Sequence, residues 1–233
     1  MPGAIVHLLI VDKLKQNLID DIDMNKLYLG SLIPDAIHFI PNFTREDKKK
    51  AHLRLGIRDA HFHSGEGLKL YHERLNIFIE NLNNVPIAEI EYYLGYLIHL
   101  ISDELFVLST RRDFVLHQNA LGLVAESKES FYHFIKDIDL IDRHMLSHVT
   151  NKKAMIKRIS RIEGFNHING ISVDCVKGNS ERIIRKKFDC EEPLELTYFI
   201  TEQMILKLID QVAEEIKFRF SSHHILKDYL KDI

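Results

Sequence analysis

The chain has 233 residues, a formal net charge of −3, 45% hydrophobic residues and 28% charged residues, which is typical of a soluble globular protein of one or at most two domains. No apolar run approaches the ~20 residues that would span a bilayer. The only cysteines, Cys175 and Cys190, exclude a disulfide framework and a cysteine-rich zinc motif, so any metal site has to use His, Asp and Glu.

The N-terminal segment does not have the pattern of a signal peptide. It lacks a basic leader, and its apolar run is interrupted by His7 and Asp12. Together with the scarcity of cysteine, this predicts a cytoplasmic protein in a reducing compartment.

The spacing of apolar residues is helical along almost the whole chain. In chain order it predicts helices over residues 5–18, 27–33, 68–82, 86–108, 130–149, 153–162, 194–220 and 224–233. The polar segments 41–67 and 163–180 are predicted as loops. Because no run of alternating apolar and polar residues indicates a strand, we expect a single multi-helical all-α domain over residues 1–233.

Several histidines and acidic residues interrupt this pattern. His7 lies inside the apolar run Ile-Val-His-Leu-Leu-Ile. It is either a hydrogen-bonded core residue or a metal ligand. Asp35 follows Pro34 at the end of another apolar stretch, where it could cap a turn or direct a carboxylate into a pocket. His38 could then orient Asp35. His52, in the polar segment 41–67, is by itself typical of a surface residue, as are His61 and His63.

The clearest signal is the nonapeptide Gly95-Tyr-Leu-Ile-His-Leu-Ile-Ser-Asp103. His99 and Asp103 are four residues apart and therefore share one face of a helix, with Gly95 leaving room one turn earlier. Burying an imidazole and a carboxylate costs several kcal/mol, on the order of the polar-burial penalty, unless a partner satisfies them. A metal ion would satisfy both groups, and a structural His–Asp hydrogen bond within the helix is the alternative.

The same spacing occurs a second time, at His133 and Asp137, with His117 preceding them. His144 and His148 are also four residues apart, but their surroundings are more polar, so we expect these two at the surface.

The basic residues are unevenly distributed. Residues 151–187 contain ten Lys and Arg against three acidic residues, a net charge of +7 that leaves −10 for the remainder of the chain. Two interpretations are open: the solvated face of two amphipathic helices, or a surface that attracts phosphate or an anionic membrane. The acidic remainder argues against general nucleic-acid binding.

Taken in chain order, these segments resemble the zinc-dependent phospholipase C family, which shares its fold with the P1-type nucleases. The order is His, then Pro-Asp, then His, then Gly-x-x-x-His-x-x-x-Asp, and all of it lies within residues 6–103. The matching segments are Val6-His7-Leu8, Leu29-Gly30-Ser31-Leu32-Ile33-Pro34-Asp35-Ala36, Ala51-His52-Leu53 and the segment 95–103. The chain is most similar to the short intracellular bacterial branch of this family.

This resemblance implies an all-α domain of the phospholipase C/P1 nuclease type that holds two or three zinc ions between its helices. It implies that His52, His99 and Asp103 bind one zinc, and that Asp103 bridges to a second zinc bound by His7. Asp35 is implied as a carboxylate beside the cluster, as general base or ligand.

The family also has a third zinc site. The nearest match here is His117 with His133 and Asp137, where Asp replaces the Glu of the family. Iron or manganese would suit the same His and Asp ligands as zinc.

The function that the resemblance implies is hydrolysis of a phosphate ester with metal-activated water as the nucleophile. The substrate is a phosphate-ester small molecule or a phospholipid headgroup, with weak contact of residues 151–187 to an anionic membrane as a further possibility. Two alternatives stay open: a related hydrolase with another substrate, and a metal-binding or metal-free helical scaffold that works through a partner.

Overall fold

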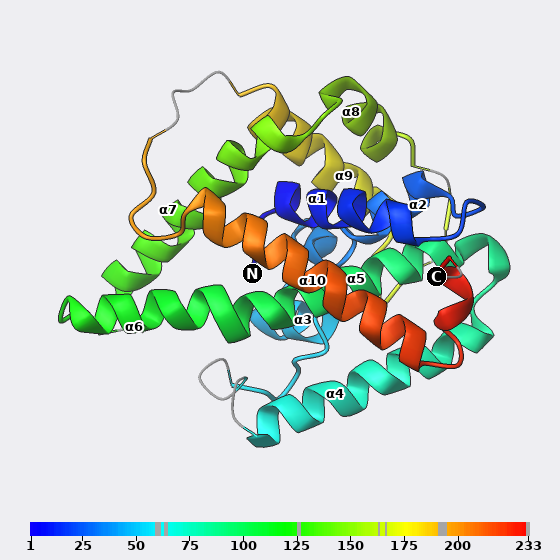
Figure 1. Cartoon of the computed structure of the whole chain (residues 1–233), viewed down its shortest axis with the longest axis horizontal. Coiled ribbons are helices and arrows are strands. Elements are labelled where there is room, and N and C mark those ends of the chain that lie inside the picture. Colours follow the sequence, from blue (N-terminus) through cyan, green and yellow to red (C-terminus); the bar gives the residue numbers. More distant parts are fainter. Residues whose placement is uncertain are drawn as a thin grey trace.

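The computed structural model describes residues 1–58, 62, 65–124, 127–162, 164–165, 167–190 and 195–231. Within these residues the chain forms helices and two isolated β-bridges but no strand, which confirms the expected all-α class. The α-helices are α1 (Ala4–Leu14), α2 (Met24–Gly30), α3 (Arg45–Ala51), α4 (Gly65–Glu80), α5 (Ile90–Phe106), α6 (Arg112–Ala120), α7 (Lys128–His144), α8 (Lys152–Ser160), α9 (Val173–Ile183) and α10 (Glu202–Ser222) (Figure 1).

Helices α1 and α5 form the centre of the molecule. Every residue of α1 from Ile5 to Val11 is buried, and so is every residue of α5 from Leu94 to Glu104. A helix that is buried on all sides needs neighbours on all sides. Helix α1 packs against α2, α5, α7 and α10, and α10 also packs against α5, across which it runs in Figure 1. Polar side chains on α1 and α5 are therefore held away from water.

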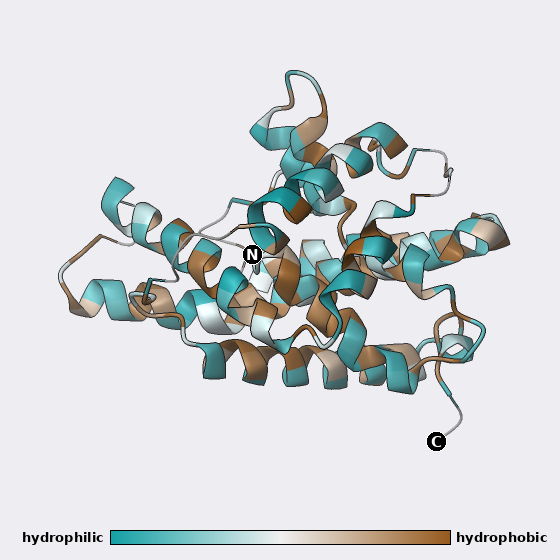
Figure 2. Cartoon of the chain, turned by 90° about the horizontal axis from the view of Figure 1, so that it is seen from above, coloured by the Kyte–Doolittle hydropathy of each residue, from teal (hydrophilic) through white to brown (hydrophobic). Residues whose placement is uncertain are grey.

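The outer helices carry apolar residues towards one continuous core. This core extends in sequence from Ile5 to Leu226 and includes residues of every α-helix named above. Polar and apolar residues alternate around these helices (Figure 2). Among the described residues, no helix combines the length and the apolar character that crossing a membrane requires.

Helices α2 and α5 cross with their backbones in contact at two glycines. A Cβ atom on Gly95 would lie 2.2 Å from the carbonyl oxygen of Leu27, and one on Gly30 would lie 2.3 Å from the carbonyl oxygen of Tyr92. No larger residue fits such an approach. The crossing brings Ser31, directly after α2, onto the face of α5 that carries the polar residues of the motif.

The start of α1 is fixed by a residue far away in the sequence. Its N-cap, Gly3, has no side chain to cap the helix. Instead, one carboxylate oxygen of Asp142 on α7 accepts hydrogen bonds from the backbone N–H groups of Ile5 (2.8 Å) and Val6 (3.2 Å). A buried carboxylate at a helix N-terminus is favoured by the helix dipole. This contact fixes the position of α1 and therefore of His7.

Two helices lie where the sequence was expected to form loops. Within 41–67, a capping box between Thr44 and Asp47 begins α3. Within 163–180, α9 begins at Val173 and continues through Gly178, which the pattern had indicated as a loop residue. Gly178 is tolerated in the helix because the ring of Phe39 packs against it: a Cβ atom there would lie 2.5 Å from the ring.

Other boundaries also differ from the expectation. Helix α10 begins at Glu202 instead of near residue 194, because the backbone N–H groups of Phe199 and Ile200 donate to Asp137 on α7. Of the closing helix predicted over 224–233, the described residues up to 231 form a 3₁₀ turn, Lys227–Tyr229. The helix α6, which the apolar spacing did not indicate, follows α5 through the π-helical turn Val107–Arg111.

We expect Gly95→Ala to lower the free energy of unfolding by about 3 kcal/mol, the range for overpacking a core, because the new methyl group meets backbone instead of a flexible side chain. Urea denaturation measures this change. Gly65→Ala is the matched control: no atom lies within 4 Å of a Cβ atom there, so its stability should change by less than about 0.5 kcal/mol. Equal effects of the two substitutions would contradict the close crossing.

Candidate metal centre

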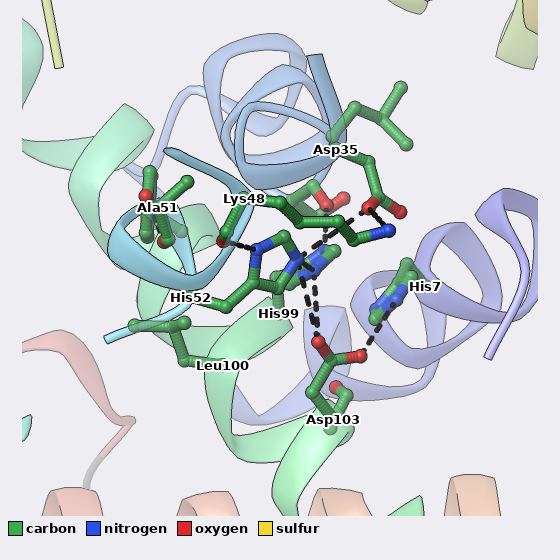
Figure 3. Close-up of polar contacts among 12 residues, drawn as sticks. His7, Asp35, Lys48, Ala51, His52, His99, Leu100 and Asp103 are labelled. Carbon is green, nitrogen blue, oxygen red and sulfur yellow. Dashed lines mark hydrogen bonds and ion pairs between the residues drawn. The ribbon is translucent and has the colours of Figure 1, made fainter. Parts of the chain in front are cut away.

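Five of the residues that the sequence singled out meet at one point (Figure 3). They come from α1, α5, the end of α3 and the 3₁₀ helix Pro34–Phe39. They form two groups that share a histidine and could hold a metal ion, and all but one of the five are buried. The groups are His7 with His99 and Asp103, and Asp35 with His52 and His99.

The distances inside this cluster are nearly equal. The Nε2 atoms of His52 and His99 lie 3.3 Å apart, and they lie 3.6 and 3.5 Å from Oδ2 of Asp103. Oδ1 of Asp35 lies 3.5 Å from the same Nε2 of His52. Three ligand atoms, Nε2 of His52, Nε2 of His99 and Oδ2 of Asp103, therefore surround one small space, and Oδ1 of Asp35 lies beside it next to His52.

This spacing fits the ligand shell of one divalent ion. Zinc binds His nitrogen and carboxylate oxygen at about 2.0–2.1 Å in tetrahedral geometry, which places neighbouring ligand atoms about 3.3–3.4 Å apart. The contacts of 3.3–3.6 Å among His52, His99, Asp103 and Asp35 are close to that separation. They are also longer than direct hydrogen bonds of ordinary geometry, whose usual range ends near 3.2 Å.

The orientation of two imidazoles also fits a cation. Nδ1 of His99 lies 2.7 Å from the carbonyl oxygen of Ser31, and Nδ1 of His52 lies 2.8 Å from that of Lys48. A carbonyl oxygen only accepts, so each Nδ1 carries the proton and donates it. In the neutral rings both Nε2 atoms then present lone pairs to each other at 3.3 Å. Such carbonyl contacts orient metal-binding histidines, and a cation between the lone pairs removes their repulsion.

The other oxygen of Asp103 faces a second position. Oδ1 of Asp103 lies 3.6 Å from Nε2 of His7, whose ring stacks on that of His99 with centroids 3.9 Å apart. Neither ring nitrogen of His7 and neither oxygen of Asp103 has a hydrogen-bond partner in the described structure. Unpartnered polar atoms at this depth are costly, so the site is incomplete without a further group.

The electrostatics favour the protonation states that bind metals. Burial opposes the charge on Asp103, but the neighbouring His99, His52 and His7 outweigh it and lower the pKa of this carboxyl well below its usual range. Burial also opposes the charge on Asp35, but the neighbouring His52, together with His99 and Lys48, outweighs it and lowers the pKa of this carboxyl as well. Both carboxylates are therefore ionised at neutral pH.

The two histidines on either side of Asp103 differ. Burial, aided by His99, lowers the pKa of His7 to about 3, so His7 is a neutral ligand at pH 7. For His99, burial acts to lower the pKa, but Asp103 outweighs it and the pKa is raised. Because a ligating histidine has to be deprotonated, the raised pKa means that protons compete with a metal ion for His99.

Other contacts hold His52 in place. The hydroxyl of Tyr96 on α5 donates a hydrogen bond to the carbonyl of Ala51, the residue before His52. The amide of Asn169 in turn donates to the Tyr96 oxygen at 3.1 Å. The end of α3 is therefore anchored to the same helix that carries His99 and Asp103.

The structure does not bring the third predicted set into such a group. Both oxygens of Asp137 are taken by backbone N–H groups of residues 198–200, at 2.5–2.9 Å. His133 stacks on Tyr198 and His117 stacks on Phe199. Asp137, His133 and His117 therefore contact the segment before α10, and among the described residues they form no group that could hold a metal ion, so their role as ligands stays a prediction.

One residue of the site was missed by sequence reasoning. Nζ of Lys48 lies 3.9 Å from Oδ1 of Asp35 and 3.1 Å from Nε2 of His38. Residue 48 lay in a predicted loop, whereas α3 places Lys48 and His52 one turn apart. The capping box that begins with Thr44 is the signal that could have revealed this helix. His61 and His63 lie outside the described residues.

A further group that could hold a metal lies at the surface. It comprises Glu80 at the end of α4 and the adjacent His223 and His224 after α10. Nε2 of His223 lies 3.4 Å from the Glu80 carboxylate, and Nδ1 of the same ring accepts from the backbone N–H of Ile225. These atoms already have partners, unlike those of His7 and Asp103.

No protein-family model, curated protein or solved structure matches the chain. The resemblance to the phospholipase C family therefore stays a prediction from four short segments. The geometry of the clustered residues supports a metal centre independently of this resemblance.

We expect His99→Ala to weaken metal binding by more than about a hundredfold, since even residues that only orient a ligand are worth 10–100-fold. His133→Ala is the matched control, because it changes the same residue in the same His-x-x-x-Asp spacing and should leave the metal content unchanged. Metal analysis of the purified proteins, with circular dichroism to check folding, measures both. Retention of metal by folded His99→Ala, or its loss from His133→Ala, would contradict the assignment.

Proposed function

We propose that the chain is a metal-dependent hydrolase of phosphate esters. The observation that carries this proposal is the position of Asp103, whose two oxygens face different histidines: Oδ2 faces His52 and His99, and Oδ1 faces His7. A carboxylate between two such positions is typical of two-metal sites that act on phosphate esters. The predicted resemblance to the phospholipase C/P1 nuclease type supports the same function.

The donor set indicates which metals would fit. Two or three imidazoles with carboxylates suit zinc, and they also suit iron or manganese. When bound, such an ion lowers the pKa of the water that it holds to about 7 and offsets charge that develops on the phosphate oxygens.

The chain's own residues define the side from which a substrate approaches. His7, His99 and Asp103 are buried, whereas the side chains of Asp35 and Lys48 are 22% and 34% exposed. The open side of the cluster therefore carries a carboxylate and an ammonium group next to each other. The ammonium group of Lys48 can pair with a phosphate oxygen, which favours an anionic ester over a neutral one.

Asp35 has two possible roles. As a fourth protein ligand beside His52, His99 and Asp103 it would close the site, and closed four-ligand sites are typical of structural zinc. As a carboxylate that orients water and accepts its proton, it would leave a coordination position free. The second role agrees with its exposure and its contact with Lys48, and the first corresponds to a helical scaffold that binds metal without catalysis.

We expect the metal-loaded protein to hydrolyse bis(p-nitrophenyl) phosphate, and a chelator to abolish this activity until zinc or manganese is restored. Asp35→Asn should lower kcat by at least about a hundredfold while the metal content is kept, as for loss of a general base. Loss of both metal and stability in Asp35→Asn, with no hydrolysis by the unaltered protein, would instead support the scaffold.

Lys48→Ala should raise KM for the same substrate by about tenfold, the size of one charge-assisted contact to phosphate. Lys50→Ala is the control, because Lys50 is an exposed lysine of the same short helix with no contact to the cluster. Steady-state kinetics at fixed ionic strength compares the two. A similar effect of both substitutions would show that only the overall charge matters.

A further inference from the structure

A groove of about 420 Å³ begins at Phe39, the last residue of the 3₁₀ helix that carries Asp35. Its walls come from the end of the 3₁₀ helix Pro34–Phe39, from α9, and from the π-helical turn Ile184–Phe188 that continues α9. The lining residues are Phe39, Gly178, Glu181, Arg182, Arg185 and Lys186. The groove thus combines one aromatic ring, one acid and three cations from the basic segment 151–187.

Glu181 offsets only one of the three positive charges that line this groove. Arg185 and Lys186 are exposed and take part in no ion pair within the described residues. Arg182 is held in place, since it donates to Oδ1 of Asn179 at 2.8 Å and its guanidinium lies 5.3 Å from the ring centre of Phe39. Like charges at close range repel each other, and a bound anion relieves this repulsion.

The groove and the metal centre share one short helix. A 3₁₀ helix has three residues per turn, so Asp35 and His38 lie on one face, and Lys48 contacts both of them. Phe39 is the next residue and begins the groove. The rise of about 2.0 Å per residue places Phe39 about 8 Å along the axis from Asp35.

We propose that this groove binds a second anionic group of the substrate, so that the substrate is a small phosphate ester that carries a further phosphate. This inference rests on the proposed function, because the first phosphate is the one placed at the metal centre. The planar guanidinium groups of Arg182 and Arg185 suit the paired oxygens of a phosphate. The groove begins four residues after Asp35 on the same 3₁₀ helix, which suits one small molecule with a phosphate at each of the two places.

The test compares two ligands that differ by one phosphate, fructose 1,6-bisphosphate and fructose 6-phosphate. Isothermal titration of the metal-loaded protein at fixed ionic strength should show binding of the bisphosphate at least about tenfold tighter. The double variant Arg185→Ala/Lys186→Ala should lose this preference while its affinity for fructose 6-phosphate is unchanged. Both substitutions are at exposed positions, and thermal melting checks that the fold is kept.

The matched control is Lys152→Ala/Lys153→Ala. These two lysines belong to the same basic segment and are exposed at the start of α8, but they do not line the groove. The control variant should keep the preference for the bisphosphate. Equal affinity of the unaltered protein for both sugar phosphates, or an equal loss in the two double variants, would overturn the proposal.

A lipid headgroup is the other source of such a phosphate. Sedimentation with phosphatidylserine vesicles distinguishes the two sources. If the unaltered protein binds the vesicles, both double variants are released equally and neither sugar phosphate is preferred, then residues 151–187 act as a diffuse membrane surface and the groove proposal is wrong.

The binding measurements with the two sugar phosphates do not depend on whether the protein hydrolyses an ester. If the protein prefers the bisphosphate but hydrolyses no ester, the groove proposal stands and the proposed function is wrong. If it hydrolyses bis(p-nitrophenyl) phosphate without preferring the bisphosphate, the proposed function stands and the groove proposal is wrong.

Discussion

The burial of Asp103 among three imidazoles is the constraint on which the rest of the structure depends. A carboxylate at this depth is costly without a compensating charge, and its contacts to His7, His52 and His99 are longer than ordinary hydrogen bonds. Helices α1 and α5 pass this point, and α3 ends at it. Each is held there by a structural contact: α1 by Asp142, α3 by the hydroxyl of Tyr96, and α5 by its close crossing with α2. The cluster therefore has the form of a preorganised ligand set, and its unpartnered atoms indicate what is needed to complete it.

The site has a closed side and an open side. The closed side consists of α1 and α5, whose burial excludes water and holds neutral His7 next to ionised Asp103. The open side consists of the short 3₁₀ helix and α3, which present Asp35 and Lys48. Among the described residues, Lys48 contacts both Asp35 and His38 on this open side, so the open side carries a cation that attracts anions.

The sequence predicted much of this arrangement, because polar residues inside apolar runs are buried on folding and need polar partners there. His7, His99 and Asp103 stand out in this way, and they do meet. The two His-x-x-x-Asp pairs show the limit of such reasoning. Around Asp103 the partners are side chains, whereas Asp137 is surrounded by backbone N–H groups of residues 198–200, a long-range contact that no local pattern reveals. Lys48 was missed for a related reason: a seven-residue helix has too few apolar residues to show a period.

The most direct test of a metal centre at Asp103 is a crystal structure of the protein loaded with zinc, with anomalous scattering recorded on both sides of the zinc edge. We expect an ion within about 2.0–2.2 Å of Nε2 of His52, Nε2 of His99 and Oδ2 of Asp103. Zinc found only at the surface group of Glu80, His223 and His224, with no ion beside Asp103, would contradict it.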